Sequence, residues 1–390
     1  MTSNLVVDIH VLQTLPPSNV NRDDTGSPKT AIYGGVRRAR VSSQSWKRAM
    51  RSELNSYLDS SELSVRTKRV TELLAKEIVL LASRYPEEAN NIEDKAQELA
   101  AKAFESAGIK VKDGKSDSKE ASYLMFIGKQ QLMNLAEEVV TAYLQKEAID
   151  KKVAKNALKG HNSIDLALFG RMVADITDLN VDACAQVAHA ISVHGVETEY
   201  DFFTAVDELK EATVEEDAGA AMLGTVEFNS STLYRYATVN VAELYRSLGD
   251  LNAAKKGTEA FVKSFVFSIP TGKQNSFAHR TLPDLVYVVL RKDQSVSLVG
   301  AFETPLQGSG SGGRVVKAAA TLASYANDIT NTYGNNAYSS WVLGIGDNVV
   351  APFETIASKV TIDSLTTLVG DAVFAHLQGR KEDGDAWQHS

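Results

Sequence analysis

The sequence predicts an α+β fold, in which a split βαββαβ sheet of the RRM or ferredoxin-like type is interrupted by a large helical insertion. Residues 4–13 form an apolar, β-branched run that is typical of a central strand. From about residue 62 to residue 190 the composition changes to Ala, Leu, Glu, Lys and Gln with helical spacing. Strand and helix patterns then return toward the C-terminal end.

The segment between the first strand and the insertion predicts a loop, a short strand and a helix. The turn-rich residues 16–19 end the first strand. Ser42 or Ser43 is the expected N-cap of the helix, because a serine hydroxyl can accept from free backbone N–H groups of the first turn. Free N–H donors of this kind also attract phosphate. Helical spacing predicts one polar face of Gln44, Lys47, Arg48 and Arg51, opposite a packed face of Trp46, Ala49, Met50 and Leu54.

Residues 194–226 differ from the helical insertion before them. They contain an aromatic cluster at residues 200–203 and an acidic, Gly- and Ala-rich run from residue 211 to residue 224. We therefore expect a long projecting excursion, and loops of that length usually serve a function. Burial in the core is the alternative for Phe202 and Phe203, provided that the excursion folds back.

The remaining elements complete the predicted sheet. Strands are expected at residues 260–269 and 284–290, joined by a long hairpin tip at residues 270–281. Lys273 and Gln274 in this tip suit contacts to a sugar-phosphate chain. Helices are expected at about residues 314–332 and 362–377, with an apolar segment that begins at Trp341 between them.

The charge distribution points to a polyanion. The chain has 41 Lys and Arg residues against 49 Asp and Glu residues, for a net charge of −8. Between Asp24 and Glu53, however, it carries seven basic residues and no acid. A basic segment on an acidic background favours phosphate binding over an ordinary solvated helix face. Gly34 and Gly35, just before the arginines, would let a ligand backbone come close.

Composition excludes several classes of protein. At 44 % hydrophobic residues, the chain of 390 residues is expected to be globular. Cys184 is the only cysteine, which excludes disulfides within the chain and cysteine-based zinc clusters. With no apolar run long enough to cross a bilayer and no signal-peptide pattern, we expect a cytoplasmic protein.

Two local patterns suggest enzymatic chemistry only weakly. Residues 308–313 fit G-x-G-x-x-G, but no buried strand precedes them, so a flexible loop is the better interpretation. Asp23 and Asp24 could hold a divalent metal for phosphodiester hydrolysis. Adjacent aspartates in a loop more often form Asx turns or pair with a neighbouring arginine.

Several segments, taken in chain order, resemble the CasC family, the backbone subunit of the type I-E CRISPR surveillance complex Cascade. The similarity is nearly full length and becomes less distinct over the terminal hundred residues. The segments that carry it are residues 21–24, 31–35, 38–45, 47–51, 165–172, 188–191, 203–207, 224–228 and 234–237.

The resemblance implies a hand-shaped protein with an RRM-like palm, a helical fingers domain and a protruding β-hairpin thumb. Carried onto this sequence, the palm comprises residues 1–60 and 227–390, the fingers residues 61–193 and the thumb residues 194–226. It also implies a non-enzymatic subunit without cofactor or metal, which oligomerises along CRISPR RNA and kinks it at regular intervals. The implied partners are CRISPR RNA, the target DNA strand through the guide, further copies of the chain, other Cascade subunits and a recruited helicase-nuclease, with no membrane.

The resemblance also assigns RNA-binding residues. In the thumb, Phe202 and Phe203 would form the wedge that displaces a base. Arg171 and Met172 would lie at a flanking base. The predicted phosphate contacts are Arg22, Arg38, Arg40, Ser42, Gln44, Lys47, Arg48 and Arg51 in the palm, with Lys273 and Gln274 from the tip.

Two other functions stay open at this point. One is a metal-dependent ribonuclease that uses Asp23 or Asp24, as in related type III complexes. The other is a single-strand RNA-binding protein that acts alone.

Overall fold

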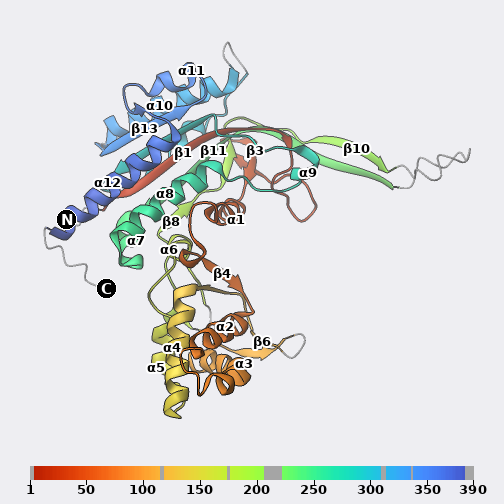
Figure 1. Cartoon of the computed structure of the whole chain (residues 1–390). Coiled ribbons are helices and arrows are strands. Elements are labelled where there is room, and N and C mark those ends of the chain that lie inside the picture. Colours follow the sequence, from red (N-terminus) through yellow and green to blue (C-terminus); the bar gives the residue numbers. More distant parts are fainter. Residues whose placement is uncertain are drawn as a thin grey trace, which may run out of the picture. The chain divides into compact units, whose positions relative to one another are not determined.

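The computed structural model describes residues 4–114, 118–173, 176–205, 222–308, 313–334 and 337–382. The chain divides into two compact units, which we call the sheet unit and the helical unit. The sheet unit comprises residues 1–53, 187–238 and 262–367, and the helical unit comprises residues 54–186, 239–261 and 368–390. Figure 1 shows the elements coloured along the sequence.

Among the described residues, a ten-stranded sheet is the main feature of the sheet unit. Eight strands follow the order β14-β13-β12-β1-β11-β9-β3-β2, and β8 and β10 both pair with β11. The strands are β1 (Val6–Ser18), β2 (Thr30–Tyr33), β3 (Val36–Val41), β8 (Ala185–Val187), β9 (Ala190–Ser192), β10 (Glu199–Ala205), β11 (Met222–Asn240), β12 (Leu285–Arg291), β13 (Ser339–Gly344) and β14 (Ser358–Lys359).

The predicted first strand is the central strand β1. It pairs antiparallel with β12 from Val6 opposite Arg291 to Leu12 opposite Leu285. Its side chains are buried on both faces, which explains its continuous apolar sequence. Helix α10 (Gly313–Tyr333) contacts β1 on the sheet and lies beside α11 (Asp347–Val350) (Figure 1). The short helices η3 (Val299–Phe302) and η4 (Ala351–Phe353) contribute buried phenylalanines to the same core.

The predicted strand at residues 260–269 is wrong. These residues lie mostly in helix α8 (Leu251–Phe267), and the short helix α9 (Gln274–Phe277) follows before β12. The predicted hairpin tip is therefore a helix-to-strand connection. Phe261, Val262, Phe265 and Val266 are all buried, at the spacing i, i+1, i+4 and i+5 of one helix face. Their β-branched and aromatic character favoured a strand, and the helical period outweighs it.

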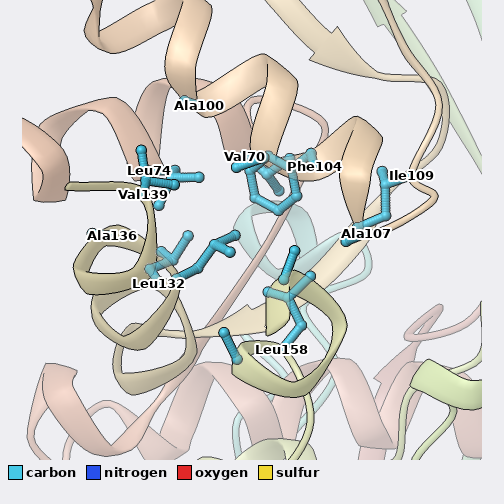
Figure 2. Packing of buried hydrophobic residues seen from close by; sticks show 14 of the residues in the cluster. Val70, Leu74, Ala100, Phe104, Ala107, Ile109, Leu132, Ala136, Val139 and Leu158 are labelled. Carbon is cyan, nitrogen blue, oxygen red and sulfur yellow. The ribbon is translucent and has the colours of Figure 1, made fainter. Parts of the chain in front are cut away.

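Helices build most of the helical unit. Its core packs Leu74, Phe104, Leu132 and Leu158 together from four segments (Figure 2). The helices are α2 (Val70–Ala82), α3 (Ala89–Ser106), α4 (Lys129–Gln145), α5 (Lys151–Ala157), α6 (Ile164–Phe169) and α7 (Val241–Leu248), with the short helices η1 (Ser60–Glu62) and η2 (Thr177–Leu179). Two small antiparallel ladders pair β4 (Ser64–Thr67) with β7 (Met125–Gly128) and β5 (Val111–Asp113) with β6 (Lys119–Ala121).

Helices α8 and α12 (Ile362–Glu382) contribute residues to both units, and Leu54, the last residue of α1 (Ser43–Leu54), belongs to the helical unit. The longest segment of the helical unit is residues 54–186, whereas the sequence placed the insertion at 61–193. The palm, fingers and thumb bounds stay a prediction. In the described ranges, every helix is too short or too polar to span a bilayer.

Candidate nucleic-acid interface

Helix α1 forms one wall of the candidate site. As predicted, Trp46 and Met50 are buried, while Gln44 and Arg48 are exposed on the other side. Ser42 is the N-cap, since its hydroxyl accepts from Ser45 N at 3.3 Å. Lys47 is only half-buried, and burial lowers the pKa of its ammonium group.

A buried arginine that sequence reasoning did not assign fixes α1 to the sheet. The guanidinium carbon of Arg235, on β11, lies 3.8 Å from the centroid of the Trp46 ring. Its guanidinium also donates to Gln13 Oε1 at 2.5 Å and to the carbonyl of Phe265. Burial lowers the pKa of Arg235 to about 9. Two sequence signals could have found it: an arginine is unusual in the apolar part of β11, and residues 234–237 are among the segments that carry the resemblance.

A groove of about 790 Å³ runs between α1, the loop at residues 20–26 and residues 270–273. Three of the predicted phosphate-binding cations line it, namely Arg22, Arg48 and Lys273. Residues 270–273 come close to the loop because Gly272 has no side chain. A Cβ atom there would lie 2.3 Å from the carbonyl oxygen of Val20. The groove thus joins segments that are 250 positions apart in the sequence.

The loop over the groove is held by its own side chains. Asn19 Nδ2 donates to Gly26 O at 3.0 Å and to Glu227 O at 2.8 Å. Asp23 Oδ1 accepts from Thr25 Oγ1 at 2.7 Å and from the backbone N–H groups of Thr25 and Ser27, both at 3.0 Å. The Thr25 hydroxyl is the main reason why the pKa of Asp23 is lowered. Asp23 therefore stabilises the loop through local hydrogen bonds.

The structure places Arg38 away from the groove. Its side chain is 0 % exposed and donates to four backbone carbonyls: Tyr33 at 3.2 Å, Ser192 at 2.9 Å, Phe302 at 3.0 Å and Glu303 at 3.1 Å. Burial lowers the pKa of this guanidinium. A group so enclosed has no surface to offer a phosphate, so Arg38 stabilises the fold here.

Gly34 approaches the chain itself, where the sequence predicted an approach to a ligand. It has a φ of +57°, and a Cβ atom there would lie 1.7 Å from Glu303 O. Gly35, with a φ of +71°, has open space around it. The turn between β2 and β3 is thus docked on the segment that also receives Arg38.

Arg171 is likewise enclosed, in the helical unit. Its guanidinium donates to Leu179 O at 2.7 Å and to Phe126 O, Gln131 Oε1 and Leu158 O at 3.2 Å each. Burial lowers its pKa to about 10. The neighbouring Met172 is 87 % exposed. Of these two residues predicted to bind RNA, one is therefore enclosed and the other is exposed.

The other residues predicted to contact phosphate differ in their exposure and in their hydrogen-bond partners. Arg40 is half-buried and donates to Thr30 O at 3.2 Å and to His189 Nδ1 at 3.3 Å. Arg51 is half-buried near the end of α1, and Gln274 is exposed at the start of α9. Ser42 is buried, so its N-cap bond is its main role here.

Strand β10 carries the two predicted wedge residues. It pairs antiparallel with β11, from Glu199 opposite Phe228 to Ala205 opposite Met222, and Figure 1 shows the two strands side by side. Phe202 is 64 % exposed and Phe203 is 42 % exposed, on opposite faces of the ladder. The Phe203 ring lies over Gly224, where a Cβ atom would be 2.4 Å from its Cζ. The rest of the predicted excursion, residues 206–221, lies outside the described residues, as do residues 309–312 of the predicted G-x-G-x-x-G loop.

The side chains of the groove can be compared with those expected of a metal site and with those expected of a site for a charged, flexible ligand. Within the described ranges, no three His, Cys, Asp or Glu residues are grouped in a way that could hold a metal ion. The groove instead gathers cations, hydroxyls and two carboxylates, Asp23 and Asp24, on an open surface. Such a lining suits a charged, flexible ligand better than a small apolar one.

Comparisons with known proteins assign the chain to a family. A family model described as CT1975-like protein, Cas_CT1975, matches residues 7–369. The chain belongs to this Cas protein family. No curated protein matches this Cas protein. It is similar to a chain of a solved "CRISPR RNA-guided surveillance complex, pre-nicking", with 34% identity and a TM-score of 0.77 over 93% of this chain and 100% of that one.

A second solved structure gives a similar result. A chain of a "CRISPR RNA-guided surveillance complex" is 29% identical, with a TM-score of 0.67, over 93% of this chain and 99% of that one. Together with the family match, these similarities support a role in CRISPR defence.

Proposed function

We propose that this Cas protein is a backbone subunit of a type I-E Cascade complex, in which several copies bind one CRISPR RNA. The groove that gathers Arg22, Arg48 and Lys273 is the observation that carries the proposal. The similarity to chains of RNA-guided surveillance complexes supports it.

Phosphates of the guide RNA bind in the groove. The cations come from three separate segments, so together they can follow a sugar-phosphate chain instead of a single point charge. Contacts to the backbone carry no sequence information, which suits a subunit that must accept any guide. The bases remain available, and Watson–Crick pairing with the target DNA strand supplies the specificity.

The β10–β11 ladder acts as the thumb. Its exposed Phe202 and the ring of Phe203 stack on bases and displace one base at regular intervals, as exposed aromatic side chains do in single-strand binding proteins. Met172, also exposed, packs against a flanking base. The ladder fixes the backbone of β10, so the wedge keeps its place when RNA binds.

The partners follow from this role. Further copies of the chain and other Cascade subunits complete the complex in the cytoplasm, and a recruited helicase-nuclease cuts the DNA. The subunit itself carries out no catalysis. Arg38 and Arg171 support the fold instead of contacting RNA, because both guanidinium groups are already satisfied within the chain.

Charge reversal in the groove tests RNA binding. Arg48→Glu combined with Lys273→Glu should abolish binding of guide RNA by the full chain, for every guide sequence alike. Lys292→Glu combined with Lys359→Glu, which reverses two exposed cations of the same unit outside the groove, is the matched control and should bind like the wild type. Equal binding by both variants would overturn the groove as the RNA site. Tight, non-cooperative binding by the isolated monomer would favour an RNA-binding protein that acts alone.

A metal-dependent ribonuclease is the second candidate, because Asp23 and Asp24 line the same groove. The purified complex, supplied with Mg²⁺ and complementary RNA, separates the two functions. We expect intact RNA. Cleavage at regular spacing that disappears in Asp24→Ala would support the ribonuclease and contradict the scaffold.

A further inference from the structure

The two carboxylates of the groove have different surroundings. Asp23 already accepts three hydrogen bonds from its own loop. The carboxylate of Asp24 has no hydrogen-bond or ion-pair partner among the residues that the structure describes, although Arg22 and Arg48 line the same groove. Asp23 therefore stabilises the loop, whereas the carboxylate of Asp24 is available to a ligand.

An available carboxylate is unfavourable in a groove that binds phosphates, because like charges repel. It becomes favourable when the ligand brings a hydrogen-bond donor, since a carboxylate accepts and does not donate. The phosphodiester groups of RNA offer no donor, and the donors on the bases differ from one base to the next. The 2′-hydroxyl of ribose is the one donor that every internal nucleotide of RNA carries, and DNA lacks it.

We propose that the Asp24 carboxylate accepts a hydrogen bond from a ribose 2′-hydroxyl and so makes the groove selective for RNA over DNA. The inference rests on the proposed function, because it takes the ligand of the groove to be the guide RNA. It adds a specificity-determining residue that a purely phosphate-binding groove would not need.

The geometry of the loop suits this role. The backbone on both sides of Asp24 is fixed, since Asp23 N donates to Ser27 O at 3.0 Å and Gly26 N donates to Asp23 O at 3.3 Å. Asp24 thus lies on a loop that needs little further ordering when it binds. A volume of about 790 Å³ admits a nucleotide, and the hydroxyls of Ser45 and Thr271 also line the groove.

The experiment compares four oligonucleotides of one guide sequence: RNA, DNA, 2′-O-methyl RNA and 2′-fluoro RNA. The last retains the sugar pucker of RNA but has no 2′ donor, so it separates hydrogen bonding from helical shape. Affinities are measured by fluorescence anisotropy for the full chain and for Asp24→Ala and Asp24→Asn. Asp328→Ala is the matched control, because Asp328 is an exposed carboxylate on α10 of the same unit and outside the groove.

We expect the wild type to prefer RNA over DNA, 2′-O-methyl RNA and 2′-fluoro RNA by about tenfold, the value of one hydrogen bond to a charged acceptor. Asp24→Ala should remove most of this preference by weakening RNA binding, with DNA binding unchanged or slightly tighter. Asp24→Asn, which keeps an acceptor, should retain part of it. Asp328→Ala should behave as the wild type does.

Three results with the variants and probes would overturn the inference, in addition to equal binding of RNA and DNA by the wild type. One is an unchanged preference for RNA in Asp24→Ala. Another is 2′-fluoro RNA that binds as tightly as RNA, which would assign the selectivity to helical shape. The third is a preference that EDTA abolishes, which would make Asp24 a cation ligand. Failure of the wild type to bind guide RNA at all would count against the proposed function, whereas equal binding of RNA and DNA would count against this inference alone.

Discussion

The β2–β3 hairpin and helix α1 belong to one basic stretch of sequence, yet their arginines have opposite environments. Arg38, on β3, is fully enclosed and donates to four carbonyls of its own chain. Arg48, on α1, is exposed and lines the groove. A local excess of positive charge therefore contains both a structural and a ligand-binding component, and contacts with distant segments of the chain decide which residue belongs to which.

The largest expected effect separates these two components by stability. Arg38→Met should lower the free energy of unfolding by about 4 kcal/mol, because four backbone carbonyls each lose a donor and two of them, those of Ser192 and Phe302, belong to buried residues. Arg48→Ala should change it by no more than about 0.5 kcal/mol, as is usual for an exposed side chain. Urea denaturation followed by circular dichroism measures both. Similar values for the two variants would remove the distinction.

The docked turn offers a second test within the hairpin. Gly34→Ala should destabilise the protein by about 2 kcal/mol more than Gly35→Ala, because only the Cβ at position 34 meets the Glu303 carbonyl. Both glycines have positive φ, so the strain of an L-residue cancels in this comparison. Equal unfolding midpoints for the two variants would show that the turn is not docked as the structure has it.

The exposed component is tested by salt. Arg48→Ala should lower the magnitude of the slope of log K against log salt concentration by about 0.7, the amount for one lost phosphate contact to a single strand. The loss of affinity should be the same for unrelated guide sequences. A loss confined to one guide sequence would point to contact with a base edge instead.

The smallest effect is expected at Lys47, whose half-buried side chain is intermediate between the enclosed Arg38 and the exposed Arg48. Burial lowers the pKa of Lys47, so folding places its charge in an unfavourable environment at neutral pH. Because the pKa is lowered in the folded state, Lys47 loses its charge there at a lower pH than in the unfolded state. The cost of burying the charge is therefore relieved as the pH rises through the folded-state pKa, and the wild-type protein should become slightly more stable in the alkaline range. Lys47→Met should abolish this gain and raise stability at pH 7 by no more than about 0.5 kcal/mol, while weakening RNA binding. Thermal denaturation from pH 7 to pH 10 is the check, and an alkaline gain that persists in the variant would assign it to another group.

The sequence predicted those elements whose pattern is local. The apolar run of β1, the two-faced pattern of α1 and the helical composition before residue 190 each identify one element without reference to the rest of the chain. Residues 260–269 failed as a strand because β-branched and aromatic residues occupy one face of a buried helix there. In such a short apolar run the strand propensity and the helical period conflict.

Other features depend on contacts between distant segments and could not be predicted in this way. The burial of Arg38 depends on carbonyls at residues 302 and 303, and that of Arg171 on four segments of the helical unit. The groove exists only because residues 270–273 reach the loop at residue 20. Charge and spacing identified the right stretch of sequence, but they could not tell which of its cations line the groove.

The most direct test of the account is to co-express the chain with the neighbouring genes of its operon and a CRISPR array, and then to size and sequence any RNA that co-purifies. The account predicts repeat-spacer RNA of uniform length, bound by several copies of the chain and lost in the Arg48→Glu, Lys273→Glu variant. Heterogeneous RNA, or none, would contradict the backbone role.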